Sequence, residues 1–247
     1  KKFSNLRKLL SNLSPMDAAN LIEEFELEDL IILFRLLPKD LAADTFVEMD
    51  SDNQEMLINA FTDKELESVV GELYVDDAVD IIEEMPANVV KRILKHTDSE
   101  TRKSINELLQ YPKDSAGSIM TVEYVDLKKN MTVSEAFNRI RKIGVDKETI
   151  YTCYVLDKNR KLEGIITAKD LMVSARDVVL ENIMETNVIS VNTLDDEEVV
   201  ADKMSKYDFI AIPVVDKENR LVGIITVDDV MDVIEQETTE DFTKMAA

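Results

Sequence analysis

The sequence predicts an α+β multidomain protein, in which an N-terminal all-α superhelical repeat domain is followed by a tandem pair of α/β units. Two observations support this fold class. Apolar residues recur at helical spacing through most of residues 1–112. The pattern of residues 154–172 then returns in residues 213–231 at a constant offset. Such self-similarity is typical of an internal repeat, so the second half of the chain is expected to hold two copies of one fold.

The N-terminal region is expected to consist of short helices. Segments 17–25 and 77–85 place apolar residues three and four apart and begin with an aspartate, which favours the helix dipole. Helix breaks recur at Ser14–Pro15, Leu37–Pro38, Asp50–Asp52, Thr62–Asp63 and Met85–Pro86. Because similar helical segments follow one another between these breaks, we expect stacked repeats that form a superhelix.

Each copy of the C-terminal repeat is expected to hold a β-hairpin followed by a helix. In the second copy, residues 213–216 and 221–226 are rich in β-branched side chains and flank a polar turn at 217–219. The helix that follows carries its apolar residues at helical spacing. Further helices are expected at residues 133–143 and 195–206.

The two copies differ in length. Residues 118–121 match residues 182–185 at a slightly larger offset than the hairpins do, so the first copy is expected to carry extra residues around 144–149. Residues 111–117 lie between the helical region and the first copy. They are short and polar, which predicts a joint that buries little surface.

These motifs resemble a known family. The sequence G-I-I-T-x-x-D closes each hairpin unit and I-M introduces each copy, which is similar to a pair of CBS domains. An acidic helical segment precedes the pair, Asp114–Gly117 stands before the first I-M, and the acidic segment 227–241 follows. Together they resemble the cytosolic region, a helical N domain plus a CBS-domain pair, of the MgtE family of bacterial magnesium transporters and channels.

The resemblance implies a division of the chain into four parts. An acidic helical superhelix of the MgtE N type is expected at residues 1–112, the first CBS domain at 113–176 and the second at 177–236. Residues 237–247 would begin a connecting helix toward a membrane domain. No apolar run in this sequence approaches the length of a membrane helix, which by itself predicts a soluble protein. The resemblance implies instead that the chain is the soluble part of a multi-pass protein, on the cytoplasmic side of the bacterial cell membrane.

Composition excludes several function classes. The formal net charge of -22 makes nucleic acid an improbable partner and favours cations or basic surfaces. The lone cysteine, Cys153, stands in an apolar strand and is expected to be a buried structural thiol. The lone histidine, His96, is expected to be solvated or to cap a helix C-terminus. Phosphate-binding glycine motifs are absent from the sequence, so we expect no enzymatic activity.

Carboxylate oxygens are the metal ligands that this chain offers in quantity. A Ca²⁺-binding loop starting at Asp157 fails because its sixth position is Leu162 and its twelfth is Ala168, which favours a simple turn. Mg²⁺ keeps much of its water and takes one or two carboxylates at a site, so dispersed acids can bind several ions weakly. Zinc is disfavoured because clusters of Cys and His are absent from the sequence.

Clusters of acids strengthen the metal hypothesis. A single surface acid is usually no more than a solvated charge, but residues 195–198 are four consecutive acids. Asp76 and Asp80 lie one helical turn apart, where like charges destabilise each other. No Lys or Arg stands between Thr226 and Asp241, although that segment contains seven acids. A bound cation would relieve this repulsion.

The family resemblance assigns metal-binding roles to individual positions. It implies a Mg²⁺ ligand set made of Asp44, Asp76, Asp80, Gly117, Asp196, Glu198, Asp208, Asp229, Asp232, Glu237, Glu240 and Asp241, with Gly117 acting through its backbone carbonyl near Asp208. The expected function is that of a magnesium-sensing regulatory region: Mg²⁺ would bridge the acidic faces of the helical and CBS domains, compact the molecule and close a pore. The resemblance further implies a homodimer formed through the CBS domains and a covalently linked membrane channel domain.

Two other functions remain open. CBS pairs of other proteins bind ATP or another adenine nucleotide where the Thr and Asp of I-T-x-x-D meet the ribose, which would assign Thr167 with Asp170 and Thr226 with Asp229 to a nucleotide. Lys169 is the one nearby cation, which disfavours strong phosphate binding. A plain interaction scaffold, whose acids only keep it soluble, would not respond to divalent ions.

Overall fold

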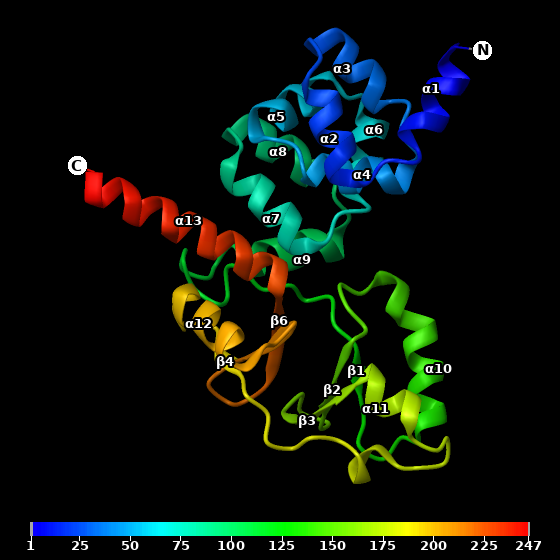
Figure 1. Cartoon of the computed structure of the whole chain (residues 1–247), viewed down its shortest axis with the longest axis vertical. Coiled ribbons are helices and arrows are strands. Elements are labelled where there is room, and N and C mark those ends of the chain that lie inside the picture. Colours follow the sequence, from blue (N-terminus) through cyan, green and yellow to red (C-terminus); the bar gives the residue numbers. More distant parts are fainter. Residues whose placement is uncertain (1, 247) are drawn as a thin grey trace. The chain divides into compact units, whose positions relative to one another are not determined.

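The computed structural model describes the backbone of residues 2–246 and the side chains of residues 5–235, 237–239, 242 and 243. The chain divides into two compact units, residues 1–107 and 108–247 (Figure 1). The first unit is helical and the second contains both strands and helices, which confirms the expected order of an all-α domain followed by an α/β repeat.

The first unit is a succession of short helices. They are α1 (Lys2–Leu10), α2 (Pro15–Glu23), α3 (Leu27–Phe34), α4 (Lys39–Val47), α5 (Ser51–Ala60), α6 (Asp63–Val70), α7 (Val75–Glu84), α8 (Ala87–His96) and α9 (Ser99–Leu108), whose last residue falls across the unit boundary. Packing of α2 on α4, α4 on α6 and α6 on α8 stacks the repeats. The expected breaks act as caps. The Ser14 side chain, for example, accepts a hydrogen bond from the Asp17 N–H at the start of α2.

The core of the helical unit contains three phenylalanines. The ring centroid of Phe34 lies 6.2 Å from that of Phe46 and 5.4 Å from that of Phe61. The Gln54 side chain, which is also buried, donates to the Phe46 carbonyl at 2.9 Å. Helices α3, α4 and α5 are thereby joined by apolar contact and by a satisfied buried amide.

His96 corrects the expectation of a solvated histidine. It is the last residue of α8, but only 14% of its side chain is exposed and its Nε2 lies 3.4 Å from Asp63 Oδ1. Asp63 begins α6, which packs against α8. This contact could not be predicted from the sequence, because it joins residues of two separate helices.

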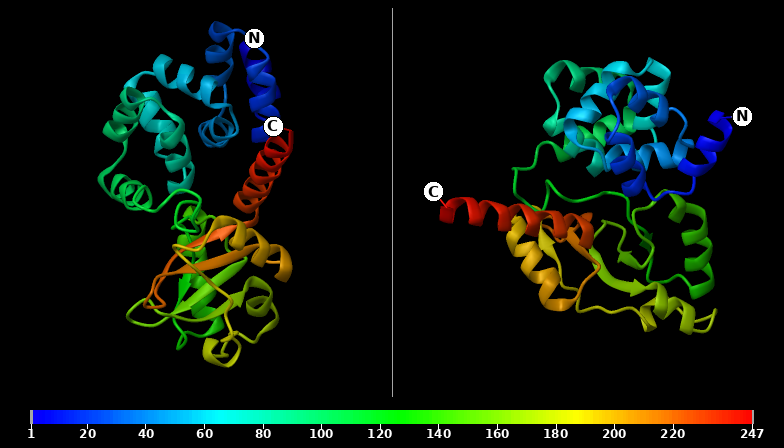
Figure 2. Two further views of the ribbon diagram at one scale, coloured as in Figure 1. Left: turned by 90° about the vertical axis from the view of Figure 1, so that its left-hand side faces the viewer. Right: turned by 45° about the horizontal axis from the view of Figure 1, so that its top comes forward.

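The second unit contains the two copies of the repeat. The first copy comprises β1 (Asp126–Leu127), α10 (Val133–Ile143), the 3₁₀ helix η1 (Gly144–Asp146), β2 (Thr152–Leu156), β3 (Leu162–Thr167) and α11 (Ala168–Val173). A second 3₁₀ helix, η2 (Leu180–Asn182), leads to the second copy, which comprises β4 (Val191–Asn192), α12 (Glu197–Tyr207), β5 (Ala211–Val215), β6 (Leu221–Thr226) and α13 (Val227–Ala246). Figure 2 shows α12 beside α13 in both views, and the two helices pack together.

Each copy builds its own three-stranded sheet with the same topology. The orders are β1-β2-β3 and β4-β5-β6, and in each sheet the first strand is parallel to the second, which is antiparallel to the third. The chain between α10 and β2 is longer than that between α12 and β5, and η1 lies in it. The extra residues of the first copy therefore lie where the sequence predicted them.

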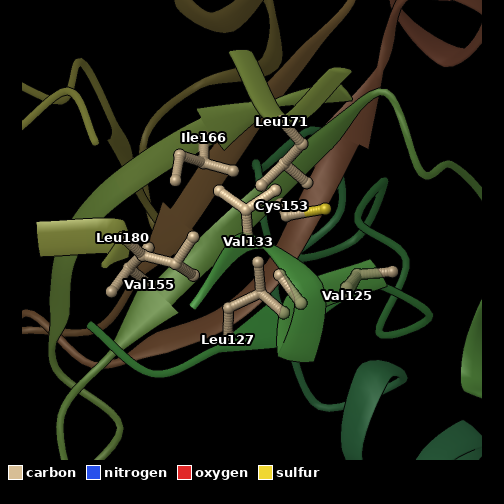
Figure 3. Close-up of a cluster of buried hydrophobic side chains, with 9 residues drawn as sticks. Val125, Leu127, Val133, Cys153, Val155, Ile166, Leu171 and Leu180 are labelled. Carbon is tan, nitrogen blue, oxygen red and sulfur yellow. The ribbon is translucent and has the colours of Figure 1, made fainter. Parts of the chain in front are cut away.

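The core of the first copy surrounds Cys153. Figure 3 shows the thiol among branched apolar side chains that come from β1, β2, β3 and the helices, including Val133, Ile166 and Leu171. Burial raises the Cys153 pKa to about 12. The expected buried structural thiol is thus present.

A glycine in each hairpin allows the other copy to approach. A Cβ atom on Gly223 would lie 2.7 Å from both the Met120 Sδ and the Thr121 carbonyl oxygen. On Gly164, it would lie 2.8 Å from the Glu185 carbonyl oxygen and 3.1 Å from the Met184 Sδ. Each I-M segment therefore rests on the glycine of the other copy, where a side chain would collide.

Backbone hydrogen bonds accompany both of these approaches. Thr121 N–H donates to the Ile224 carbonyl at 2.8 Å and Ile224 N–H donates back at 2.9 Å. Ile165 and Glu185 exchange the same pair of bonds, both at 2.9 Å. The repeated sequence motifs thus fasten the two copies to each other as well as building each copy.

The joint before the first copy is more buried than predicted. Ser115, Ala116 and Gly117 are buried, although residues 111–117 were expected to bury little. Ala116 N–H donates to the Asp195 carbonyl at 2.7 Å and Gly117 N–H to the Thr193 carbonyl at 2.9 Å. The expectation was wrong because small residues, typical of a linker, also fit closely against a neighbouring backbone.

Candidate functional site

A concentration of acids in the second unit surrounds Glu197, the first residue of α12. Asp196 precedes the helix as its N-cap, and its carboxylate accepts the Glu198 N–H at 3.0 Å. The Glu197 N–H donates to the Asp114 carbonyl at 3.1 Å, which brings the joint to this helix start. The packing of α12 against α13 brings Glu237 to the same place.

The pKa of the Glu197 carboxyl reflects the nearby carboxylates. The residue Glu197 as a whole is 8% exposed. The pKa of its carboxyl is raised to about 7, first by partial burial and then by the carboxylates of Asp114, Glu237, Asp196 and Glu198. Three of the predicted ligands, Asp196, Glu198 and Glu237, are therefore brought together. Asp114 was not among the predicted ligands. Its φ of 58°, a conformation that Asp tolerates better than most residues, turns the joint toward α12.

The first turns of α13 hold a second group of acids. Asp229 is half-buried, and its Oδ2 accepts the Thr226 hydroxyl at 2.7 Å and the Thr226 N–H at 3.2 Å. Burial, followed by the charges of Asp228 and Asp232, raises the Asp229 pKa to about 6 despite these hydrogen bonds. The pKa of Asp232 is also raised, first by burial and then by Glu235 and Asp228. Glu240 and Asp241 carry side chains that lie outside the described residues.

The predicted ligands of the helical unit lie on two helices. Asp44, on α4, is exposed, and its pKa is raised by partial burial of the carboxyl and by the charges of Asp40 and Glu72. On α7, Asp76 is buried and Asp80, one turn later, is exposed. Repulsion between acids is therefore a feature of both units.

The remaining predicted ligands have distinct surroundings. The Gly117 N–H is bound to the Thr193 carbonyl, and a Cβ on Gly117 would lie 2.5 Å from the Tyr111 ring. Asp208 ends α12 in the left-handed conformation, with φ of 54°. Across the described residues, no group of three or more His, Cys, Asp or Glu side chains is arranged to hold a metal ion. The available oxygen donors suit a hydrated Mg²⁺ that takes few protein ligands, and they do not form an all-protein cage.

A cleft of about 590 Å³ lies between the two copies in the second unit. We call it the Thr167 cleft, because Thr167 lines it at the end of β3 together with Lys169. The second copy contributes Tyr207 and Phe209 to the lining, and the rings of these two residues stack with their centroids 5.5 Å apart. Stacked rings suit a flat heterocycle. The charged side chains of the lining are the ammonium group of Lys169 and the carboxylates of Glu185 and Asp208.

The predicted nucleotide residues are only partly placed in this cleft. Among the described lining residues, Thr167 is the one that was predicted to contact a nucleotide. Thr167 and Asp170 form the capping box of α11, with 2.5 Å between the hydroxyl and the Asp170 Oδ2. Thr226 and Asp229 make the equivalent pair at α13. Capping therefore accounts for all four side chains without a ligand.

Among the helices of the described residues, none has the length and hydropathy to cross a membrane.

Comparison with known families identifies both halves of the chain. A family model described as the MgtE intracellular N domain matches residues 13–114. The CBS domain model matches twice, at residues 116–177 and 176–236. The two models together span nearly all of the sequence.

Curated relatives match along the whole chain. The magnesium transporter MgtE of Thermus thermophilus is 38% identical over 98% of this chain, and that of Bacillus subtilis is 31% identical over 100%. Each alignment covers 54% of the relative. The chain therefore spans about half the length of the curated relatives it matches.

Two solved structures are similar to this chain over most of its length. One, described as the cytosolic domain of the Mg²⁺ channel MgtE in complex with ATP, is 36% identical with a TM-score of 0.87 and covers 92% of this chain and 93% of its own. The other, the soluble part of a magnesium transporter, is 33% identical with a TM-score of 0.89 and covers 96% and 93%. Both similarities include the helical unit and the repeat.

Proposed function

The chain belongs to the MgtE family of magnesium transporters, and from that premise we propose that it is the magnesium-sensing regulatory region of a magnesium channel or transporter. The family is one of transporters and not of enzymes, in agreement with the motifs found in the sequence. The chain corresponds to the intracellular, soluble part of its relatives.

The observation that carries this proposal is the packing of two acid-rich helices, α12 and α13. It gathers Asp196, Glu198 and Glu237 around the buried Glu197. Carboxylates held this close repel one another, and a divalent cation between them would remove that cost. Oxygen ligands and room for water are what Mg²⁺ requires.

In the proposed mechanism, Mg²⁺ acts by joining acidic surfaces. With little magnesium present, the acids of the helical unit repel those of the CBS pair and the two units separate. Ions bound by Asp44, Asp76, Asp80, Gly117, Asp196, Glu198, Asp208, Asp229, Asp232, Glu237, Glu240 and Asp241 would hold them together. Compaction of this region would then close the pore of the linked membrane domain, so that cytosolic magnesium limits its own entry.

Several weak sites are sufficient for such a switch. An ion that binds the compact state about tenfold better than the extended state contributes about 1.4 kcal/mol. Moving a two-state equilibrium from mostly extended to mostly compact takes about 5.5 kcal/mol. About four ions would supply this amount, so no individual site has to be a high-affinity cage.

The assembly is proposed to be a homodimer formed through the CBS domains. Exposed apolar side chains on this unit, among them Tyr151, Met172 and Met231, provide surface for such contacts. A membrane channel domain would be linked covalently to the same chain. Its activity would be regulated by this region and would not be performed by it.

Small-angle X-ray scattering across a Mg²⁺ titration tests the proposal. Ionic strength is held constant with a monovalent salt. We expect the radius of gyration to fall as Mg²⁺ rises, and to fall less in the double variant D76A/D80A. The matched control is E24A/E28A, which removes two exposed acids of the same unit and should behave like the unaltered chain. An unchanged radius of gyration in Mg²⁺ contradicts the proposal.

A second proposed function is the binding of an adenine nucleotide in the Thr167 cleft. It is supported by the stacked Tyr207 and Phe209 rings and by the relative whose structure was solved with ATP. Lys169 would hold the phosphates. Isothermal titration of ATP into the chain and into the F209A and K169A variants tests it. Equal affinity in all three would contradict this assignment.

A further inference from the structure

A second cleft in the first copy is basic, in contrast to the rest of this acidic chain. It has a volume of about 480 Å³ and lies where β1, α10 and the turn between β2 and β3 meet. We call it the Arg160 cleft. Four of its lining residues are basic and two are acidic, in a chain whose formal net charge is -22. The basic residues are Lys128, Arg139, Lys147 and Arg160, and the acidic ones are Asp126 and Asp146.

Hydrogen bonds position the basic groups around this cleft. The Arg160 Nη2 donates to the Tyr124 hydroxyl at 2.6 Å and to the Leu221 carbonyl at 3.3 Å. The Lys128 ammonium donates to the Asp157 carbonyl at 3.2 Å. Both residues donate to uncharged oxygens in these contacts. Lys128 also interacts with the Asp157 carboxylate, since its charge is one of those that lower the Asp157 pKa. Arg160 is therefore held in place with its charge available to a ligand, whereas part of the Lys128 charge is already offset.

The negative charges of the two acidic lining residues do not neutralise the positive charges of the four basic ones. Asp126 is already engaged by Arg139, whose Nε also donates to the Asp126 carbonyl at 2.6 Å. Asp146 is exposed, whereas Lys147 is half-buried. Within the described part of the chain, the structure records no ion pair or hydrogen bond for the Lys147 side chain. An excess of positive charge thus remains on the wall of a half-buried cleft.

The second copy shows that the fold itself does not require these charges. The strand registers, Leu127 with Val155 and Val191 with Val214, fix which positions correspond. In the second copy, Lys128 is replaced by Asn192 and Arg160 by Asn219. Asn219 adopts the same left-handed conformation as Arg160, with φ of 60° and 65°. Asn is the more usual residue at such an angle, so the turn geometry does not account for the arginine.

One contact is kept in both copies. Arg139 corresponds to Lys203, which donates to the carbonyl of Ser190 at 3.4 Å just as Arg139 donates to that of Asp126. This conserved pairing ties each helix to its strand and explains Arg139 structurally. The contact of Arg160 with the Leu221 carbonyl also has a counterpart, since the Asn219 amide donates to the Leu162 carbonyl at 3.4 Å. An uncharged side chain makes that contact in the second copy, so the contact does not require a positive charge at Arg160. The charges of Arg160 and Lys128 are the feature that a ligand would explain.

We propose that the Arg160 cleft binds a small anion that carries a phosphate group. The guanidinium of Arg160 matches phosphate oxygens as a planar fork, while Lys128 and Lys147 supply point charges. Val122, Ile143 and Leu156 add an apolar wall for an organic part of the ligand. The cleft is distinct from the Thr167 cleft, with which it shares no lining residue. The charge of -22 opposes approach to an anionic membrane, so we expect a soluble phosphorylated compound rather than a lipid headgroup.

Amide chemical shifts of the whole chain during a pyrophosphate titration test this proposal. The titration is done without Mg²⁺, which pyrophosphate would chelate, and at constant ionic strength. We expect saturable shifts at Lys128, Lys147 and Arg160. The variant K128N/R160N gives the first copy the residues of the second and removes two contacts, so its affinity should fall at least about tenfold. The control K158N/K217N removes two exposed charges from the hairpin turns and should retain the response.

A second experiment distinguishes a soluble phosphorylated compound from a lipid headgroup as the ligand. Flotation with vesicles that contain phosphatidic acid is compared with flotation using phosphatidylcholine alone. Binding to the acidic vesicles that K128N/R160N abolishes supports the cleft with a lipid headgroup as its ligand. A pyrophosphate response without vesicle binding supports a soluble ligand. The proposal is overturned if neither occurs, if both variants respond alike, or if the shifts are confined to amides near Thr167 and Lys169.

Discussion

The backbone N–H of Glu197 donates to the backbone carbonyl of Asp114 at 3.1 Å, and this bond fastens the joint before the first copy to the start of α12 in the second. The same arrangement adds the Asp114 carboxylate to those that face Glu197. A structural contact and an unfavourable charge interaction thus occur at one place. The backbone hydrogen bonds of residues 114–117 act against this repulsion.

Replacing Glu197 by Gln should stabilise the metal-free chain at high pH. The Glu197 pKa is about 7 in the folded state against 4.5 as its ordinary value, so the folded state binds the proton more tightly. The contribution of Glu197 to folding stability is therefore most favourable below pH 4.5 and is lost as the pH rises from 4.5 to 7. E197Q should match the unaltered chain at pH 4.5 and exceed it at pH 8. Urea unfolding in the presence of EDTA measures both.

The matched control for this experiment is D202N. Asp202 is exposed on the same helix and is not among the carboxylates that raise the Glu197 pKa. D202N should keep the fall in stability between pH 4.5 and 7. If E197Q loses stability over this range as steeply as the unaltered chain, the folded-state pKa of Glu197 is not raised.

Glu65 should show the opposite pH dependence. The Arg35 Nε donates to the Glu65 Oε1 at 2.7 Å and the Thr62 N–H donates to the Oε2 at 2.8 Å, which lowers the Glu65 pKa, chiefly through Arg35. Its stabilisation is therefore present above pH 4.5 and is lost as the pH falls through the lowered pKa. E65A should cost about 1 kcal/mol at pH 7 through loss of the cap, and less at pH 3.

Chemical denaturation at pH 7 and pH 3 checks the Glu65 prediction. E67A is the control, since Glu67 is exposed on the same helix, and its effect should stay within about 0.5 kcal/mol. A cost for E65A that is the same at both pH values would show that the charge of Glu65 contributes nothing.

Gly223→Ala should destabilise the CBS pair. The added Cβ would lie 2.7 Å from the Thr121 carbonyl oxygen, and a backbone atom cannot move aside as a side chain can. Overpacking of this kind costs about 1–3 kcal/mol. G164A should behave in the same way, because its Cβ would meet the Glu185 carbonyl. Thermal unfolding measures the losses, and a G223A variant as stable as the parent would contradict the described approach.

Cys153 should be unreactive in the folded protein. Its side chain is fully buried and its pKa is raised to about 12, so very little thiolate is present at pH 8. Labelling with a chromogenic disulfide reagent should proceed only as fast as the protein opens, and urea should accelerate it. Rapid and complete labelling without denaturant would show that the thiol is accessible.

Patterns that repeat along the chain could be predicted from the sequence. The apolar periodicity of the helical region and the two hairpins predicted the fold class, and the helix at residues 133–143 has the predicted bounds. The second helix was expected from residue 195 but begins at Glu197, because Asp195 and Asp196 use their carboxylates to accept the N–H groups of Asn192 and Glu198. A run of acids does not show which of them caps the helix.

Contacts between distant residues could not be predicted in the same way. The acidic clusters were visible in the sequence, but the approach of Asp114 to Glu197 depends on a backbone turn at Asp114. The Arg160 cleft was not predicted at all, since Lys128 and Arg160 are separated by a strand and a helix and each reads as an ordinary surface charge. Only the folded repeat, with Asn192 and Asn219 at the corresponding positions, makes the two charges distinctive.

The reciprocal seating of each I-M segment on the other copy's glycine has a consequence for how such a pair can be divided. In a polypeptide that contained one copy, the surface around the hairpin glycine would be exposed, and the I-M segment would have no glycine of another copy to pack against. Each of these is complementary to a second molecule of the same kind, as in a domain-swapped dimer. The tandem chain thus resembles such a dimer whose two molecules are joined by a peptide link, and separated halves should recover their fold by pairing.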